Sequence, residues 1–461
     1  MRIVLSIPAF LPHSSGGGQV YVHQVGRELQ RLGNAVTVLS DAPWQGGEGT
    51  RQVKRYEYDG LPVCCIQINP SAKGWDDDFT GLGTKLLEVL GSCLDEIRPD
   101  IVHLGGFKAP LNRICLERGI PHVATAHHPG VVCPAGTLLT HRRKLCTARA
   151  TREICVPCCT KQRSRNGAVG ALLSVVPEPL ARRASAWGTR KGRLGFIARA
   201  LAYARGIERS LASKEDLLRR VPIWIAPSHA IRTYLILNGA PKESVRVVPH
   251  GIEPMDRLSL EPYQRRPLRF GYMGEMAIPK GFHVLIQALS LMDPSADCEL
   301  HVFSKAHHPW NKRYLDDSLR RFRGKPPVIF HDTVSRGALS SAYAQFDVLV
   351  VPSIFLEVLG LVILESFAAG RPVIATQSGG PAELIRHGVD GLLVRRNDPR
   401  DLARAMEILV ENRGEVERMA GNIMPVRTIR QHVEDLLPVY EEARHSIGPA
   451  VLRNVSSKGS R

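Results

Sequence analysis

The sequence predicts two doubly wound α/β domains. The chain has 461 residues, which is more than one ordinary hydrophobic core accommodates. In its first half, short apolar segments of strand length alternate with amphipathic helical segments. A second series of the same kind starts at Leu268, after a segment rich in proline, arginine and acidic residues, Glu253–Pro267, which we interpret as a linker. Such alternation implies parallel strands with right-handed crossovers, and ligands then bind beyond the carboxyl ends of the strands.

The first series contains six expected strands and four expected helices. The strands are Arg2–Ile7, Ala35–Leu39, Asp100–Leu104, His122–Ala126, Ile223–Ala226 and Val245–Pro249. The helices are Val20–Leu32, Leu86–Ile97, Pro110–Glu117 and Leu194–Leu211. The pattern is clearest in Val20–Leu32, where valines and leucines recur on one helical face and Gly33-Asn34 provides a stop signal.

The second series has strands and helices in the same alternation. Its expected strands are Leu268–Gly271, Leu300–Phe303, Val328–Phe330 and Asp347–Val351, and its expected helices are Phe282–Leu289, Leu361–Ala369 and Gln431–Arg444. Between Gly370 and Val394 we further expect a strand, a Gly-rich loop, a helix, a Gly turn and a short strand. Leu361–Ala369 is apolar on nearly every face, which predicts a buried helix ending at Gly370. Glu365 interrupts this apolar helix, and Glu357 precedes it by seven intervening residues. A buried glutamate needs a partner; from the helix alone, backbone donors or a nearby arginine explain Glu365 as well as a ligand does.

Charge and hydropathy limit the class of protein. Lys and Arg exceed Asp and Glu by 17, which favours anionic partners such as nucleotides, nucleic acid or an anionic membrane face. No apolar run approaches the roughly 20 residues of a membrane span, and the first residues lack the features of a signal peptide, so we expect a cytoplasmic protein. The basic segment Lys161–Arg220 contains the helix Leu194–Leu211. This helix could lie on the inner membrane face or pack by its apolar stripe, whereas no recognition motif supports nucleic-acid binding.

Five of the ten cysteines lie within residues 133–159. Cys133, Cys146, Cys155 and Cys158 have the spacing C-x12-C-x8-C-x2-C, and Cys159 follows directly. Four thiolates suit a tetrahedral structural zinc ion. A redox-labile disulfide pair and reduced thiols are the alternatives, and all three remain open. No set of three ligands with a neighbouring acid indicates a catalytic metal.

Gly16, Gly17 and Gly18 form a glycine-rich loop that is not a dinucleotide fingerprint. The third glycine position is Tyr21, and about eight residues separate the loop from the first strand, whereas the fingerprint follows its strand at once. The loop is instead a flexible entry to a helix N-terminus, which suits a phosphate or another polar ligand.

Motifs in order along the chain resemble those of family 4 glycosyltransferases, which have the GT-B architecture. The matching segments are Gly16–Leu32, Asp100–His103, Thr125–His128, Ile225–Ser228, Val248–Glu253, Gly271–Gly281 and the E-x7-E pair Glu357 and Glu365 with Gly379, Gly380 and Glu383 downstream. The cysteine insertion resembles one found in a subset of the family. Each motif is weak by itself, but their common order is specific.

The resemblance implies two Rossmann-like domains facing a central cleft. Residues 1–255 would form the acceptor-side domain, with a cysteine-rich and basic insertion over about 129–220. Residues 256–426 would bind the nucleotide sugar, and 427–461 would form a helix that returns toward the N-terminal domain, followed by a polar tail. The implied enzyme is a retaining, hexosyl-type glycosyltransferase that needs no cofactor for catalysis. It would use a UDP- or GDP-linked donor and a glycan or lipid-linked acceptor, as in polysaccharide biosynthesis.

The resemblance also implies roles for single residues. His127 and Glu357 would be catalytic and face the donor sugar, Lys280 would neutralise the diphosphate, and Glu365 would accept hydrogen bonds from the ribose. Gly274, Gly379, Gly380 and Glu383 would complete the donor site, and Gly16–Gly18 would form the acceptor and phosphate loop.

Three positions depart from the family pattern. Glu275 stands where the family usually has an arginine beside Lys280, Leu359 replaces an aromatic feature, and His128 replaces a common aspartate. Because Glu275 puts a negative charge beside the predicted diphosphate site, a second hypothesis stays open. In it, the chain is a non-catalytic protein that binds a nucleotide sugar or an anionic partner. The acidic run Asp76–Asp78 is predicted to be solvated surface and not a metal-binding motif.

Overall fold

The structure is a computed structural model that describes residues 1–14, 16–42, 51–68, 84–163, 193–259, 267–304, 309–320, 322–332 and 334–446. Its contacts divide the chain into two units. Unit 1 comprises Met1–Pro227, Ile231–Pro249 and Arg430–Arg461, and unit 2 comprises Ser228–Ala230 and His250–Ile429. The expected domain limits were residues 255 and 426. Three features named from the sequence lie outside the described residues: Asp76–Asp78, the basic residues 164–192 and the tail from 447.

Unit 1 is built on an eight-stranded sheet of order β3-β4-β2-β1-β5-β6-β7-β8, in which only the β3–β4 pair is antiparallel. The strands are β1 Arg2–Ile7, β2 Ala35–Ala42, β3 Arg51–Tyr58, β4 Leu61–Ile68, β5 Ile101–Leu104, β6 His122–Thr125, β7 Ile223–Ala226 and β8 Val245–Val247. The helices are α1 Gly17–Arg31, α2 Thr84–Ile97, α3 Lys108–Arg118, α4 Arg152–Arg163, α7 Arg193–Arg220, α8 His229–Leu237 and α16 Ile429–Ser446. All six strands and four helices expected for the first series are confirmed.

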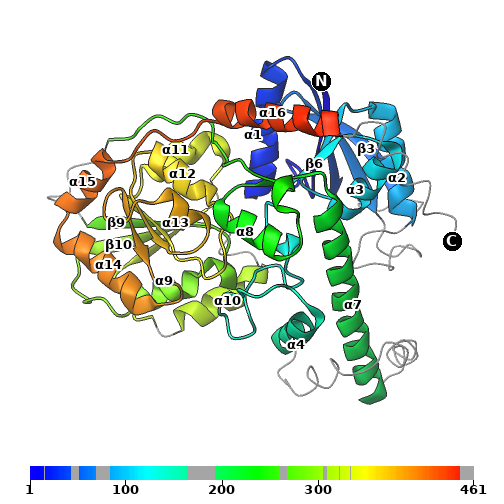
Figure 1. Cartoon of the computed structure of the whole chain (residues 1–461). Coiled ribbons are helices and arrows are strands. Elements are labelled where there is room, and N and C mark those ends of the chain that lie inside the picture. Colours follow the sequence, from blue (N-terminus) through cyan, green and yellow to red (C-terminus); the bar gives the residue numbers. More distant parts are fainter. Residues whose placement is uncertain are drawn as a thin grey trace. The chain divides into compact units, whose positions relative to one another are not determined.

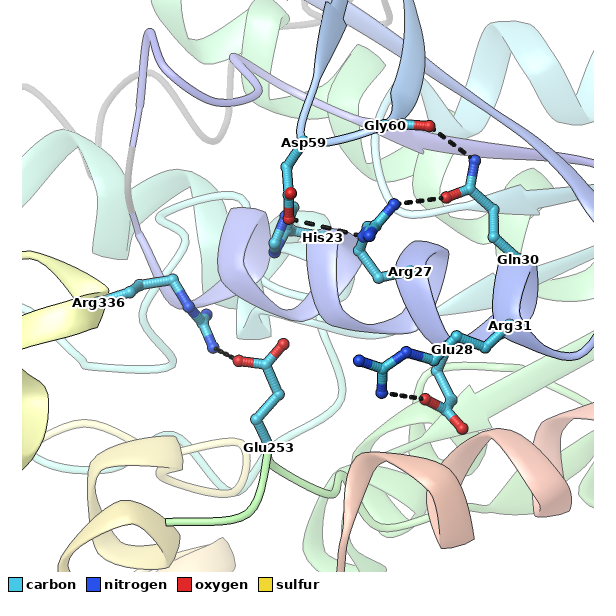
Figure 2. A network of polar contacts seen from close by, with 9 residues as sticks. All are labelled: His23, Arg27, Glu28, Gln30, Arg31, Asp59, Gly60, Glu253 and Arg336. Carbon is cyan, nitrogen blue, oxygen red and sulfur yellow. Dashed lines mark hydrogen bonds and ion pairs between the residues drawn. The ribbon is translucent and has the colours of Figure 1, made fainter.

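The β3–β4 hairpin was not predicted from the sequence. Its two-residue turn, Asp59-Gly60, has positive φ at both positions, which is the conformation that Asp-Gly favours between twisted strands. Figure 2 shows how the turn is held to α1. His23 lies 2.9 Å from the Asp59 carboxylate, and Gln30 donates to the carbonyl of Gly60 at 2.9 Å. The hairpin therefore extends the parallel sheet by an edge that α1 supports.

The C-terminal helix α16 belongs to unit 1 from Arg430 onward. Two buried histidines connect it to the rest of the unit. His103 Nδ1 lies 2.7 Å from the Tyr440 hydroxyl, and His432 Nε2 lies 2.9 Å from the Tyr21 hydroxyl. Burial lowers the pKa of His103 to about 3, so this histidine is neutral at physiological pH. His103, which belongs to one of the family-like motifs, thus has a structural role in holding α16.

Part of the basic helix α7 packs against α4. Ala204 and Ile207 are buried against Cys155, Val156 and Cys159 of α4. This contact agrees with the packed alternative for these residues, and attachment of the helix to a membrane surface stays a prediction. The described residues contain no helix that is both long and apolar enough to cross a membrane.

Unit 2 is built on a six-stranded parallel sheet of order β11-β10-β9-β12-β13-β14. The strands are β9 Leu268–Met273, β10 Cys298–Phe303, β11 Val328–His331, β12 Val348–Val351, β13 Val373–Thr376 and β14 Gly391–Val394. The helices are α9 Phe282–Leu289, α10 Pro309–Leu319, α11 Leu339–Tyr343, α12 Leu361–Ala368, α13 Gly380–Leu384, α14 Pro399–Glu411 and α15 Gly414–Gly421. Helices α9, α10 and α14 cover one face, and α11 and α12 cover the other (Figure 1). The strands and helices expected for the second series are confirmed, including α16 and the elements β13, α13 and β14 expected between Gly370 and Val394.

The segment interpreted as a linker is in part packed into unit 2. Met255 and Leu258 pack against the core formed by α11, α12 and their neighbouring strands, and the amide of Leu258 donates to the carbonyl of Ala369 at 3.2 Å. Ile252 is bridged to Thr428 at the other end of the unit. The described part of the segment therefore belongs to unit 2 and is not a free linker, because Met255 and Leu258 are partly buried against its core.

Candidate functional site

The main candidate site lies at the carboxyl edge of the unit 2 sheet, between β9 and β12. The chain leaves β9 toward β10 on one side and returns to β12 on the other, so this is the topological switch point at which such sheets bind ligands. The loop after β9 carries Lys280, and the loop after β12 carries Glu357. Lys280 Nζ donates to Glu357 Oε1 at 2.8 Å, and the ammonium also lies 5.0 Å from the centre of the Phe355 ring. The structure therefore brings together two residues that the sequence singled out separately.

The two loops are held in register by their backbones. The amide of Ile354 donates to the carbonyl of Pro279 at 2.8 Å. Gly281 has a φ of +74°, and a Cβ at this position would lie 1.9 Å from the carbonyl oxygen of Pro352. Only glycine allows this approach, so Gly281 fixes the distance between the Lys280 loop and the Glu357 loop.

The glycine pair after β13 packs on the Glu357 loop. Gly379 has a φ of +61°, and its Cβ would lie 2.1 Å from the carbonyl oxygen of Glu357. The amide of Gly380 donates to that same carbonyl at 2.9 Å. These contacts show that both glycines hold the backbone that carries Glu357, which is a positioning role. Direct contact with a donor remains a prediction for both.

Glu365 is half-buried on α12. The Tyr343 hydroxyl donates to Glu365 Oε2 at 3.0 Å. Burial raises the pKa of Glu365, while the Tyr343 hydrogen bond and the charge of Arg336 lower it. The net direction is upward, so the protein holds this carboxylate at a cost. A single tyrosine partner leaves the other carboxylate oxygen for a ligand hydroxyl.

The structure adds residues that the sequence did not identify. Tyr343 orients Glu365, and Ser353 donates to Glu357 Oε1 at 2.6 Å. Arg336 donates to Glu253 at 2.6 Å, as Figure 2 shows. The charge of Arg336 also lowers the pKa of Glu365. Ser304 and Ser378 are buried at the same edge of the sheet, and neither hydroxyl has a hydrogen-bond partner among the described residues. Their position directly beyond strand ends is the one signal that could have identified these serines from the sequence.

The contacts of Glu383 and Gly274 differ from those expected of residues that bind the donor. Both oxygens of Glu383 accept backbone hydrogen bonds, from the amide of His229 at 2.9 Å and from that of Ala230 at 2.8 Å. Its carboxylate thus anchors the Ser228–Ala230 segment of unit 2. Gly274 follows β9, and a Cβ there would meet only the Tyr272 hydroxyl at 3.6 Å, which is ordinary contact. The fold therefore does not itself demand glycine at residue 274.

Glu275, which departs from the family pattern, is exposed to solvent. Its backbone carbonyl accepts from the Tyr272 hydroxyl at 3.0 Å, whereas its carboxylate has no ion-pair partner among the residues that the structure describes. The loop that would bind phosphate thus presents one anionic and one cationic side chain, and the cation is already paired with Glu357.

The remaining predicted residues lie in unit 1. His127 follows β6, and its ring packs edge-on against Tyr21 of α1 with centroids 4.7 Å apart. His128 Nδ1 accepts from the amide of Gly130 at 3.0 Å, so this residue is a strand-end histidine bonded to backbone. Gly16 is the N-cap of α1 and has no side-chain cap, and Gly17 starts the helix. A Cβ at Gly18 would meet only Ile7, at 3.5 Å, so packing does not require glycine there, whereas a Cβ at Gly16 would lie 2.8 Å from Gln19 Oε1.

Two family models match the chain. Residues 15–177 match Glycosyltransferase Family 4, and residues 267–412 match Glycosyl transferases group 1. Sucrose-phosphate synthase from Thermosynechococcus elongatus superposes with a TM-score of 0.63 at 17% identity, covering 99% of each chain. Anabaena HepE in complex with UDP-glucose superposes with a TM-score of 0.60 at 16% identity, again over 99% of each chain. The chain has the GT-B fold.

Curated relatives match parts of this GT-B chain. An uncharacterized glycosyltransferase of Methanocaldococcus jannaschii is 27% identical over 194 residues, which are 40% of this chain and 49% of the relative. A D-inositol 3-phosphate glycosyltransferase of Stackebrandtia nassauensis is 29% identical over 233 residues, 46% of this chain and 52% of the relative. The GT-B chain therefore spans about half the length of these relatives.

The cysteine segment of the GT-B chain does not form a metal site in the described residues. No group of three or more His, Cys, Asp or Glu side chains is placed there to hold a metal ion, and none of the ten cysteines forms a disulfide. Cys155 and Cys159 are buried in the apolar contact between α4 and α7, and burial raises the pKa of each thiol to about 12. The reduced-thiol alternative agrees with this packing. Cys133, Cys146 and Cys158 also raise the pKa of Cys155, so the four predicted ligands lie near one another and structural zinc stays a prediction.

Proposed function

We propose that the chain transfers a sugar from a UDP- or GDP-linked donor to a glycan or lipid-linked acceptor, with retention of the anomeric configuration. The observation that carries the proposal is the Lys280–Glu357 pair, joined at 2.8 Å at the switch point of unit 2, with Glu365 on the helix that follows. The two matching glycosyltransferase family models and the GT-B fold support it. Related folds bind such donors: HepE is described with UDP-glucose.

The chemistry assigns a different task to each donor-site residue. Breaking the anomeric bond builds positive charge on the sugar and negative charge on the leaving diphosphate. Lys280 supplies a cation for the diphosphate, which is worth most where the site excludes water. Glu357 is fixed by Ser353 and Lys280 and would accept hydrogen bonds from the donor sugar. Glu365 would accept hydrogen bonds from the ribose hydroxyls through the oxygen that Tyr343 does not occupy.

The finer parts of the proposal rest on the sequence. The role of His127 at the donor sugar comes from the family-like motif Thr125–His128, and its place beside the start of α1 agrees with a ligand-facing residue. Peripheral attachment to an anionic membrane face rests on the net charge of +17. We further propose that turnover needs no metal ion, because Lys280 provides the countercharge for the leaving group.

The exposed Glu275 favours a second candidate, a GT-B protein that binds a nucleotide sugar without turning it over. A screen of thermal stabilisation with UDP, GDP, ADP and their sugars identifies the donor. Turnover is then measured as release of nucleoside diphosphate, with and without candidate acceptors. Stabilisation together with turnover supports the transferase, whereas stabilisation without turnover on any acceptor supports the binding protein. Glu365→Ala and Lys280→Ala should each abolish both the stabilisation by the donor and its turnover. If neither substitution changes stabilisation or turnover, the site assignment is wrong.

A further inference from the structure

Two lysines of unit 1 lie at the carboxyl edge of its sheet. Lys108 is the first residue of α3, just beyond β5, and its ammonium donates to the carbonyl of Gly105. Lys214 reaches the same edge from α7, and its ammonium donates to the carbonyl of Gly130, in the loop after the neighbouring strand β6. Both lysines are partly buried. Each ammonium is held by a carbonyl group just beyond the end of one of two adjacent strands, β5 and β6.

These lysines have no carboxylate to neutralise them. Neither forms an ion pair among the described residues; their hydrogen bonds are to carbonyl oxygens. Burial lowers the pKa of Lys108 to about 8, and the charge of Lys214 lowers it too. Burial also lowers the pKa of Lys214, while the nearby Cys133 thiol acts in the opposite direction. Two ammonium groups that repel one another and are partly desolvated destabilise the empty protein, and an anion between them would relieve both costs.

Lys108 lies where this sheet should bind a ligand, and Lys214 is bonded to the loop after the next strand, β6. The strand order reverses between β1 and β5, so the loops after these strands flank the switch point of unit 1. The loops touch, because a Cβ at Gly106 would lie 2.5 Å from the Cδ of Pro8.

The groups around this point also suit an anion. The ring of His127 lies over Gly105, 3.5 Å from where its Cβ would be. That ring also packs on Tyr21 of α1. Helix α1 begins nearby without a side-chain cap and without an acidic residue in its first turn, so its amide groups add positive potential.

We propose that Lys108 and Lys214 form an anion site in unit 1 that holds a phosphate group of the acceptor. Lysine is a point charge with three donors, and two of them on different elements suit the several oxygens of a tetrahedral phosphate. The assignment of this anion to the acceptor rests on the proposed function, in which the donor diphosphate belongs to Lys280 in unit 2. The phosphate could belong to a small phosphorylated alcohol or to a lipid headgroup.

Calorimetric titration of the full chain with inorganic phosphate tests the site itself. We expect Lys108→Met and Lys214→Met to weaken phosphate binding at least about tenfold, since each removes a charge-assisted donor. Lys242→Met is the matched control, because Lys242 is an exposed lysine of the same unit and should leave the affinity unchanged. Lys280→Met distinguishes the two anion sites: it should weaken UDP binding and leave this phosphate site intact. Equal phosphate affinity in wild type, Lys108→Met and Lys214→Met would overturn the proposal.

Two further arms identify the source of the phosphate. In one, glycerol 3-phosphate competes with inorganic phosphate in the titration. In the other, the chain is sedimented with vesicles of phosphatidylcholine containing phosphatidic acid. Lysine-dependent competition indicates a small phosphorylated acceptor, and lysine-dependent sedimentation indicates a lipid phosphate; either supports the site. If neither depends on Lys108 or Lys214, the site is contradicted.

Hydrolysis of the donor in the absence of acceptor separates this proposal from the proposed function. The control Lys242→Met should hydrolyse donor at the wild-type rate. A cooperative thermal unfolding transition shows that Lys108→Met and Lys214→Met are folded. Lysine-dependent phosphate binding without any donor hydrolysis would retain the anion site and reject the transferase. Donor hydrolysis together with phosphate binding that does not depend on these lysines would retain the transferase and reject the anion site.

Discussion

Lys280 Nζ lies 2.8 Å from Glu357 Oε1, so the cation proposed for the donor diphosphate is bound to the carboxylate proposed for the donor sugar. Glu357 is buried, and the Lys280 side chain is one-third exposed. A diphosphate must therefore share or replace this partner when it binds. The pair also explains how a loop with Glu275 in place of an arginine can keep its single cation in a defined position.

The first prediction concerns Glu357→Gln. The change removes the ion pair but keeps an oxygen that can accept from Ser353. Because a partly exposed ion pair contributes about 1 kcal/mol, we expect UDP to bind about fivefold more tightly. Transfer should nevertheless fall about 100-fold, since the donor sugar loses its charged acceptor. Calorimetry and turnover measure the two effects; unchanged UDP affinity would show that the pair does not compete with the diphosphate.

Glu275→Arg should improve donor binding. The substitution replaces an exposed negative charge beside the proposed diphosphate with a positive one, and the carboxylate that it removes has no described ion-pair partner. We expect several-fold tighter UDP binding with little change in the free energy of unfolding. Glu411→Arg, an equal change of net charge at the end of α14, is the control. Equal effects of the two substitutions would place residue 275 away from the phosphates.

Glu365→Gln should stabilise the ligand-free protein while weakening nucleotide binding. Burial raises the pKa of Glu365 in the folded state, so between the unfolded and folded pKa values the folded state binds more protons. The cost of the charged carboxylate is thus fully present above the folded pKa and is lost as the pH falls toward 4.5. Urea unfolding at pH 8 and pH 5 should show a larger stabilising effect at pH 8. A variant less stable than wild type at pH 8 would contradict the prediction.

Gly379→Ala and Gly388→Ala separate backbone strain from a specific clash. Both glycines have positive φ, but a Cβ at Gly388 would meet nothing within 4 Å, whereas one at Gly379 would lie 2.1 Å from the Glu357 carbonyl oxygen. We expect Gly388→Ala to cost about 1–2 kcal/mol of unfolding free energy and Gly379→Ala clearly more. Donor turnover should fall only for Gly379→Ala. Similar losses of stability and turnover in both variants would remove the positioning role of Gly379.

Native alkylation tests the cysteine segment. Burial raises the pKa of Cys155 and Cys159 to about 12, so at pH 8 both are protonated and unreactive. Iodoacetamide followed by peptide mass spectrometry should leave both unlabelled until the protein is unfolded. Zinc measured in freshly purified protein should be substoichiometric. One zinc per chain would contradict this prediction and support the metal alternative.

Much of the fold could be predicted from the sequence because its parallel strands are short, buried and apolar. The unpredicted elements have weaker local signals. The hairpin β3–β4 is polar on one side, yet Asp59-Gly60 is a two-residue turn signal that could have identified it. The apparent linker was misinterpreted since its composition is polar, while its burial depends on Met255 and Leu258 finding a core formed by distant residues.

Residues of the candidate site could be predicted where their polarity differs from that of the neighbouring sequence. Glu365 could be singled out because a carboxylate in an apolar helix needs a reason. Its partner Tyr343 could not, because an aromatic residue in a helix is normally core and only the tertiary fold brings its hydroxyl to Glu365. Lys108 and Lys214 are ordinary lysines in the sequence; their shared edge of the sheet emerges only from the topology.

Donor turnover by Lys280→Met tests the central claim most directly. The measurement is the rate at which nucleoside diphosphate is released from the donor identified in the screen, with Lys312→Met, an exposed lysine of α10, as the matched control. We predict that Lys280→Met lowers the rate by about 100-fold or more, because the leaving diphosphate loses its countercharge, and that Lys312→Met retains the wild-type rate. Wild-type turnover by Lys280→Met would contradict the proposed donor site.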